Sequence, residues 1–204
     1  MLYEIGNPCD ISAMLLNLQQ ASNRLTLVGT VIDTAEQFSK DKSLFKLKVL
    51  LEDNMLVNVF LTEEDIPNSK VVLIDGELWN SRKGYTAYRS TVDIHALNVV
   101  ELESTDEIPK EYQNRVRIEG AVCMHPVYMS EQKRYEIVLL TRTSLGEMVR
   151  MLCSVPKGED EEKEEYERGK QKRINGEIRQ RTRRKRCGKV YIEDGVFNYI
   201  ESRR

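Results

Sequence analysis

A long internal repeat is the feature that most restricts how this chain can fold. Three motifs recur in the same order, and their separation drifts only from 91 to 100 positions. The matched pairs are 23–31 (NRLTLVGTV) with 114–122 (NRVRIEGAV), 74–78 (IDGEL) with 174–178 (INGEI), and 98–101 (NVVE) with 198–201 (NYIE). Repeats of this length are too long for a solenoid and indicate two copies of one small domain.

The length and composition fit two such domains. Each copy would hold about 80 to 100 residues, which is enough for a hydrophobic core of its own. No run of 18 apolar residues is present, so we expect no membrane span. The predicted division is an N-terminal helical extension at 1–21, a first domain at 22–104, a linker at 105–113, and a second domain at 114–204 with an acidic loop at 156–171.

Patterns that would indicate an enzyme or a metal site are missing from the sequence. The four cysteines form no Cys-x-x-Cys pair, so neither a zinc site nor a redox motif is expected. His95 and His125 lie near no nucleophile pattern, and no phosphate-binding loop or dinucleotide fingerprint occurs. We therefore expect no enzymatic activity, no metal and no cofactor. The first ten residues lack the pattern of a signal peptide, so we expect a cytoplasmic protein.

Apolar residues alternate with polar ones through most of the chain, which predicts an all-β fold. Five strands in about 80 residues favour a small closed barrel, because closure removes exposed strand edges. Residues 11–20 predict one short helix. The expected strands are 25–31, 45–51, 57–61, 72–78 and 85–102 in the first copy, and 114–122, 135–141, 147–153, 172–180 and 189–201 in the second.

The ordered motifs resemble those of the bacterial single-stranded-DNA-binding protein family. The resemblance rests on 23–31, 70–78 and 91–100 in the first copy and on 114–122 and 174–178 in the second. It implies two tandem five-stranded OB-fold barrels that bind single strands without sequence preference. The short connection at 62–69 makes the chain similar to primosomal replication protein N, a compact relative. Family members often assemble barrels from separate chains, so two barrels in one chain imply a monomer, or a homodimer through barrel edges.

Charge is distributed unevenly between the two copies. Residues 22–104 carry 9 Lys and Arg against 13 Asp and Glu, whereas residues 105–204 carry 22 against 18. Seven of those acidic residues lie at 159–167. A basic domain with one acidic loop suggests an anionic partner and an internal competitor for it. A solvated insertion that plays no part in binding is the alternative, and both interpretations stay open.

Proteins that bind single strands combine cations for the phosphates with aromatic rings for the bases. On an OB barrel the outward face of strands 2 and 3, with the loops beside it, is the usual surface. In the first domain the predicted contacts are Lys46, Lys48, Asn58, Phe60, Trp79, Arg82, Lys83, Tyr85, Tyr88 and Arg89. In the second they are Tyr128, Arg150, Arg173, Arg179, Arg181, Arg183, Arg184, Lys185 and Arg186. Packing of Phe60 and Trp79 against the other domain or the N-terminal helix is the alternative.

The prediction from sequence is therefore binding of single-stranded DNA in replication or recombination, with replication or recombination proteins as further partners and no membrane. Two alternatives remain at this stage. One is an OB-fold adaptor between proteins of a replication or mobile-element complex, in which the aromatic residues form the interface. The other is an RNA-binding OB protein, because stacking and phosphate contacts do not separate RNA from DNA.

Overall fold

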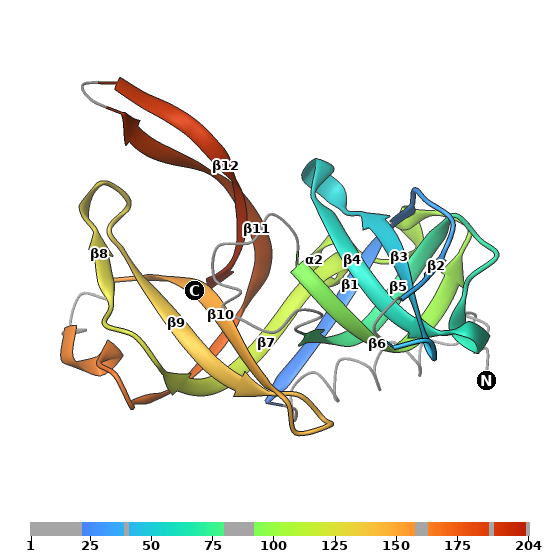
Figure 1. Ribbon diagram of the computed structural model, residues 1–204, viewed down its shortest axis with the longest axis horizontal. Helices are drawn as coiled ribbons and strands as arrows, with labels where there is room; N and C mark the ends of the chain where they lie inside the picture. The colour runs from blue at the N-terminus through green and yellow to red at the C-terminus, as the bar shows by residue number, and fades with distance from the viewer. Residues whose placement is uncertain (1–21, 39–40, 80–91, 158–162, 188–189, 203–204) are drawn as a thin grey trace.

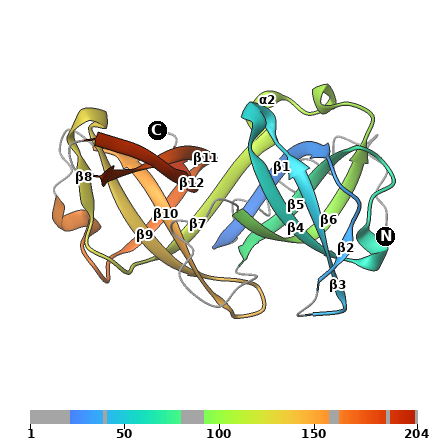
Figure 2. The same ribbon diagram turned by 45° about the horizontal axis from the view of Figure 1, so that its top comes forward.

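The computed structural model describes residues 22–38, 41–79, 92–157, 163–187 and 190–202, without the side chains of 53, 163–164 and 182–198. These residues form β-strands joined by short turns and helices (Figures 1 and 2), which confirms the all-β prediction. The expected N-terminal helix and the start of the expected strand at 85–102 lie outside the described residues. None of the described helices is long and apolar enough to cross a membrane.

The first half of the chain closes into a five-stranded barrel. Its strands are β1 (Asn23–Val31), β3 (Leu44–Leu50), β4 (Leu56–Thr62), β5 (Val71–Trp79) and β6 (Val92–Leu102). They pair in the order β1–β3–β4–β6–β5 and back to β1, with β4 and β6 parallel. The sequence missed the two-residue strand β2 (Glu36–Gln37), which pairs with β3 and is too short to show alternation.

The strands of the second half pair in the same cycle. They are β7 (Asn114–Val122), β9 (Arg134–Arg142), β10 (Met148–Pro156), β11 (Gln171–Cys187) and β12 (Val190–Ser202). Their order is β7–β9–β10–β12–β11 and back to β7, and the short β8 (Val127–Met129) pairs with β9 as β2 does with β3. Strands β11 and β12 continue beyond their pairings with β7 and β10 as a long two-stranded ribbon (Figure 1). The domain boundaries drawn from the sequence stay a prediction.

Short helices complete the described structure. The 3-10 helices are η1 (Glu52–Asn54), η2 (Glu63–Asp65), η3 (Thr105–Glu107), η4 (Ser130–Gln132) and η5 (Lys163–Tyr166), and the α-helix is α2 (Lys110–Gln113). Two of them, η3 and α2, form most of the expected linker, which is therefore more ordered than its polar sequence suggested. A capping box between Ser104 and Glu107 begins η3.

The two halves meet through antiparallel pairing of β1 with β7, which joins all twelve described strands into one sheet. Leu25 lies opposite Val116, the residue that the 91-residue offset of the repeat matches to Leu25 itself. Asn23 pairs with Ile118, and Leu27 pairs with Asn114, so the register is the same when the copies are exchanged. The pairing is therefore isologous, as in a twofold dimer, although both strands belong to one chain.

The repeated asparagine has the same structural role in both halves. The side chain of Asn23 donates to the carbonyl of Leu78 at 3.0 Å and accepts from its N–H at 3.1 Å. Asn114 makes the same two bonds with Ile178, both at 3.0 Å. Each asparagine thus clamps the first strand of its half to the strand that carries the second repeated motif, at a point where the backbone groups are shielded from water.

Two repeated glycines allow neighbouring strands to approach closely. A Cβ on Gly120 of β7 would lie 2.2 Å from the carbonyl oxygen of Leu140 on β9. A Cβ on Gly176 of β11 would lie 2.2 Å from the carbonyl oxygen of Glu201 on β12. Gly29 and Gly76 meet similar limits in the first half, at 2.7 Å and 2.6 Å from backbone oxygens. The repeat therefore retains residues that barrel closure requires.

Replacing Asn114 by alanine should destabilise the protein by about 1–3 kcal/mol, because both backbone groups of Ile178 lose their partner in a shielded position. Urea unfolding of the variant and of the wild type would measure the change. Asn175→Ala is the matched control, since Asn175 lies exposed on the same strand as Ile178. Equal losses in the two variants would contradict the clamp.

Candidate nucleic-acid interface

The outward face of the first barrel carries two rows of side chains that cross four strands. Residues paired directly across strands point to the same face of a sheet, so the pairings define the rows. We call this face the first platform. Its members are Lys46, Phe60, His95 and Glu77 in one row and Lys48, Asn58, Asp93 and Trp79 in the other. The structure thus brings together five of the predicted contact residues.

An aromatic cluster fills the centre of the first platform. The ring of Phe60 lies 4.8 Å from that of Trp79 and 5.0 Å from that of Phe38, both in edge-to-face geometry. Phe60 is 1% exposed, although its parity places it on the outward face as the sequence predicted. Trp79 is half-buried and also faces His95. A base could stack on Trp79, whereas Phe60 acts as its support.

A turn from the second half lies against the first platform. This turn, residues 143–147 between β9 and β10, places Ser144 and Glu147 beside β5. Glu77 accepts hydrogen bonds from the N–H of Ser144 at 2.7 Å and from its hydroxyl at 3.0 Å. Two residues further along β5, the indole N–H of Trp79 donates to Glu147 at 2.5 Å. The turn therefore contacts the platform at two points. Trp79 packs against the other half of the chain, as the alternative interpretation of its sequence position expected.

Glu77 is a buried carboxylate with enough partners to stay charged. It is 2% exposed, and burial by itself would raise its pKa. The hydrogen bonds from His95 and Ser144 outweigh burial and hold the pKa of Glu77 below its ordinary value of 4.5. Because its charge is satisfied inside the chain, Glu77 acts as an anchor between the halves and not as a contact for an anionic ligand.

Two other polar residues of the first platform have carboxylate partners. Lys48 forms a 2.5 Å ion pair with Asp33, which lies in the loop after β1. The amide of Asn58 donates to Asp93 at 2.8 Å, on the neighbouring parallel strand. Both side chains remain partly exposed. A phosphate could reach them only in exchange for these carboxylates.

The second half presents a more charged face at the corresponding place. Arg179 occupies the position that the repeat offset of 100 matches to Trp79, and Glu177 the position matched to Glu77. We call this face the second platform. Its members are Arg134, Glu136, Ser154, Glu177, Arg179, Arg181, Tyr199 and Glu201.

Arginines and glutamates balance each other on the second platform. Arg179 binds Glu177 at 2.6 Å and lies 3.7 Å from Glu201. Arg181 is hydrogen-bonded to Glu136, and its guanidinium lies 5.6 Å from the centre of the Tyr199 ring. Arg134 lies 3.6 Å from Glu201 and donates a hydrogen bond to Ser154. Arg134 was not among the predicted contacts. Three cations thus meet three carboxylates.

The remaining predicted contacts are less clustered. Arg150 is exposed on β10, and Arg173 forms a 2.8 Å ion pair with Glu119 on β7. Tyr128 is 44% exposed, with Lys157 5.6 Å from its ring centre and the ring of Tyr135 at 5.0 Å. Arg183, Arg184, Lys185 and Arg186 continue β11 along the ribbon, where their side chains are outside the described part. Arg82, Lys83, Tyr85, Tyr88 and Arg89 lie outside the described residues.

The end of the acidic loop is anchored against β9 and β11. Tyr166, at the end of η5, is 3% exposed and stacks near Tyr135 at 5.2 Å. Glu165 forms a 3.2 Å ion pair with Lys172, whose ammonium also lies 4.6 Å from the centre of the Tyr166 ring. One carboxylate of the acidic run therefore does neutralise a lysine of β11, while residues 158–162 lie outside the described part.

Several residues of the interface had no role in the sequence prediction. Glu77 lies inside a repeated motif, and this repetition could have marked it as a residue with a structural or functional role. Ser144 and Glu147 lie in a turn with no pattern, and their partners are 67 and 68 positions away. Phe38 gives no signal either, because it follows a two-residue strand.

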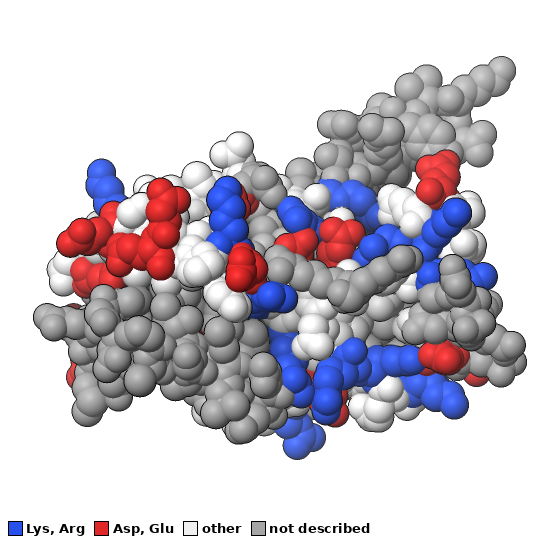
Figure 3. Space-filling view, turned by 180° about the vertical axis from the view of Figure 1, so that it is seen from behind, with Lys and Arg blue, Asp and Glu red and all other residues white. Residues whose placement is uncertain are grey.

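Seen from behind, red side chains gather over the first half and blue ones over the middle and the second half (Figure 3).

Solved structures of the single-stranded DNA-binding protein from Thermus aquaticus share this fold. The wild-type protein matches with a TM-score of 0.59 and 14% identity, over 89% of this chain and 90% of that one. A deletion mutant of it matches with the same TM-score and identity, over 92% of its chain. No protein-family model and no curated protein matches the sequence. At this identity the likeness establishes an OB-fold, as the sequence predicted.

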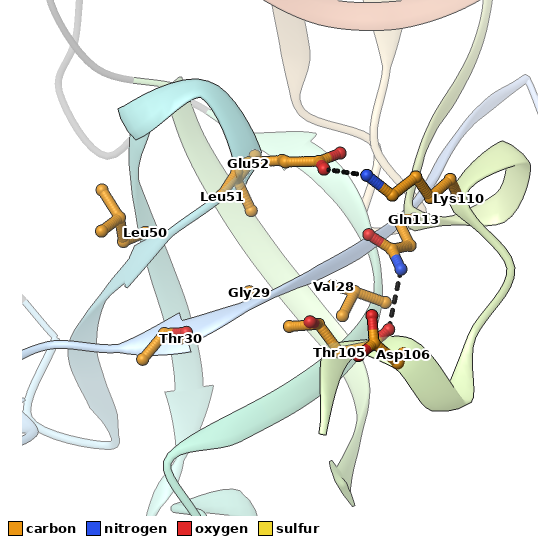
Figure 4. A pocket seen from close by; sticks show the side chains of 10 residues that line it. All are labelled: Val28, Gly29, Thr30, Leu50, Leu51, Glu52, Thr105, Asp106, Lys110 and Gln113. Carbon is orange, nitrogen blue, oxygen red and sulfur yellow. Dashed lines mark hydrogen bonds and ion pairs between the residues drawn. The ribbon is translucent and has the colours of Figure 1, made fainter. Parts of the chain in front are cut away.

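A cavity of about 210 Å³ lies apart from both platforms, between β1, the end of β3 and the linker (Figure 4). An ion pair of 2.7 Å between Glu52 and Lys110 lies at its edge. Gln113 donates to the carbonyl of Thr105 at 2.7 Å and so fixes the linker beside it. None of the residues lining the cavity is a predicted contact, and we assign it no part in binding.

Glu77 should make stability depend on pH in a defined window. Its folded-state pKa lies below 4.5, so its ionised form stabilises the fold above that pH, and the stabilisation is lost as pH falls through the folded value. Urea unfolding of the wild type and of Glu77→Gln should differ by about 1–3 kcal/mol near neutral pH and converge below 4.5. The exposed Glu63→Gln is the control. A difference that stays constant with pH would exclude this role.

Proposed function

We propose that this protein binds single-stranded DNA without sequence preference and acts in replication or recombination. The observation that carries the proposal is the fold likeness to a single-stranded DNA-binding protein over 89% of the chain. Support also comes from the cations on the outward face of the second half. We propose no catalytic role, and a cytoplasmic location is part of the same proposal.

The proposal includes two OB domains in one chain, divided as the sequence predicted. The two cycles of strand pairing and the isologous contact of β1 with β7 support this division. The aligned 89% of the chain also exceeds what either half could supply. The short connection with η2 favours the likeness to primosomal replication protein N. Because β1 and β7 use each other's edge, the chain already has the pairing that a second copy would otherwise provide.

The main binding surface in this proposal is the second platform with the ribbon beyond it. Arg179 and Arg181 lie on β11, and the strand continues into four further cations at 183–186. Phosphate would replace Glu177 and Glu136 as the partner of the two arginines. Arg–phosphate bonds are charge-assisted and bidentate, so the exchange is chemically matched. The carboxylates would keep weaker anions from the face.

The first platform would contribute stacking on Trp79 once the turn at 143–147 has moved. Trp79 and Phe60 pack within the chain, so their contacts give no support to an interface with another protein. The adaptor alternative therefore loses the observation that had favoured it. RNA remains a comparison for the binding experiment, because stacking and phosphate contacts serve both nucleic acids.

Labelled oligo-dT should bind more tightly than duplex DNA, and its affinity should fall steeply with salt, with a slope of about −0.7 per phosphate contact on a log–log plot. Replacing Arg181, Arg183, Arg184 and Arg186 together by alanine should flatten that slope by about two to three units. Fluorescence anisotropy with oligo-dT, oligo-rU and duplex DNA would measure both. Equal binding of duplex and single strand would refute the proposal, and tighter binding of oligo-rU would reassign the substrate to RNA.

Glu147→Ala should raise the affinity for oligo-dT by about tenfold, since one charge-assisted hydrogen bond contributes about 1.5–3 kcal/mol to holding the turn in place. The single tryptophan of the chain reports directly on this contact, so its emission should shift to the red in the free variant. Leu145→Ala is the control in the same turn, because Leu145 is 74% exposed. Weaker binding by Glu147→Ala would show that the turn itself contacts the strand.

A further inference from the structure

The outer side of the seam between the two halves carries a row of arginines that the binding surfaces above do not use. Arg24 of β1 lies opposite Arg117 of β7, and Thr26 lies opposite Arg115. Their neighbours Leu25 and Val116 point the other way and are at most 2% exposed. Strand alternation therefore places all three arginines on the face turned away from the core. We call them the seam arginines.

Among the described residues, one of the seam arginines has a carboxylate partner and the other two have none. Arg24 binds Asp75 of β5 through two hydrogen bonds of 2.6 Å and 2.5 Å. In the second half the repeat replaces this aspartate by Asn175, which lies opposite Arg117 on β11. Arg117 therefore lies opposite an amide, whereas its repeat counterpart Thr26 lies opposite the carboxylate that Arg24, the counterpart of Arg115, binds. The charge of this position was lost in one copy of the motif.

Arg115 is positioned without being neutralised. Its Nε donates to the main-chain oxygen of Glu111, and its guanidinium lies 6.0 Å from the centre of the Tyr112 ring. Both contacts orient the side chain, and neither supplies a negative charge. Within the described ranges, no carboxylate lies at ion-pair distance from Arg115 or Arg117, whereas the nearby Arg173 has Glu119 at 2.8 Å.

Arg117 also has a donor that needs an acceptor. Its Nε is buried and has no hydrogen-bond partner in the part of the chain that the structure describes. Buried polar atoms in folded proteins nearly always have a partner, so this unpartnered nitrogen would gain one if the side chain turned toward a ligand oxygen. The planar guanidinium fork matches the oxygens of phosphate, which can accept two parallel N–H bonds.

We propose that Arg115 and Arg117 form an oxyanion site on the seam and that a phosphate group of the bound nucleic acid strand occupies it. The inference rests on the proposed function, since the strand supplies the phosphate. Figure 3 shows blue side chains in the middle of the rear face, which fits a cationic path across the seam. A second copy of this chain is a poor occupant, because it would bring the same cations against them.

The test compares the full chain with Arg117→Met and Arg115→Met, which keep the aliphatic stem and remove the charge. Arg168→Met is the control, because Arg168 is exposed and lies outside the seam. Each seam variant should bind oligo-dT about tenfold more weakly, and the salt slope should fall by about 0.7, the value for one phosphate contact on a single strand. The control should change neither quantity. Thermal stability of Arg117→Met should not fall, since the variant removes an unsatisfied buried donor.

Each of the other possible results overturns either the proposed seam site or the proposed function. Binding intact in the seam variants, with the wild-type slope, overturns the seam site and leaves the proposed function standing. Failure of the wild type to bind oligo-dT overturns the proposed function. Inorganic phosphate that stabilises the wild type but not Arg117→Met, with DNA binding unchanged, assigns the site to free phosphate instead of a strand. A change of sedimentation coefficient in Arg117→Met assigns the face to contact between copies and overturns the inference.

Discussion

The antiparallel pairing of β1 with β7 determines where the other surfaces of the molecule can lie. It is centred on Leu25 and Val116, which the repeat matches to each other, so each half meets the other through the same strand. One side of this strand pair is buried in the core, and the other carries the seam arginines. With the seam fixed, the turn at 143–147 lies against β5, where Ser144 and Glu147 bind Glu77 and Trp79. Edge pairing between the halves thus sets which faces are open and which are covered.

Among the predicted cations whose side chains the structure describes, carboxylates inside the chain already occupy most. Lys48 has Asp33, Arg173 has Glu119, and Arg181 has Glu136. Exposed pairs of this kind add little to stability, typically below about 1 kcal/mol each. Their effect on ligand binding is larger, because a phosphate must displace a carboxylate before it gains the cation. Such a face selects for a ligand that presents several phosphates in a row, since each single exchange is close to neutral in energy.

Most of the long described strands could be predicted from the sequence to within a few residues, because period-2 alternation reports directly which side of each strand is buried. The exceptions are β11, which runs seven residues past the expected end at 180, and the short strands β2 and β8, which were missed. The repeat showed that Asn23 and Asn114 matter but not why, since the clamp on Leu78 and Ile178 depends on strand packing. Parity correctly placed Phe60 on the outward face. Its burial under Phe38 depends on a loop conformation that no local pattern encodes. The contacts between halves were missed for the same physical reason, because they join residues far apart in sequence through a turn.

The two copies keep the residues that build the barrel and differ in those that face a ligand. The asparagine clamp and the close-approach glycines are retained in both halves, because the same close pairing of strands requires them in each. At outward positions the same offset of 100 changes Trp79 to Arg179 and Asp75 to Asn175. The first change replaces a stacking ring by a cation, and the second removes the carboxylate opposite Arg117. Both changes add positive charge or remove negative charge on the second half. The two halves thus present unequal faces: an aromatic face held by a turn, and a charged face whose arginines are paired with glutamates.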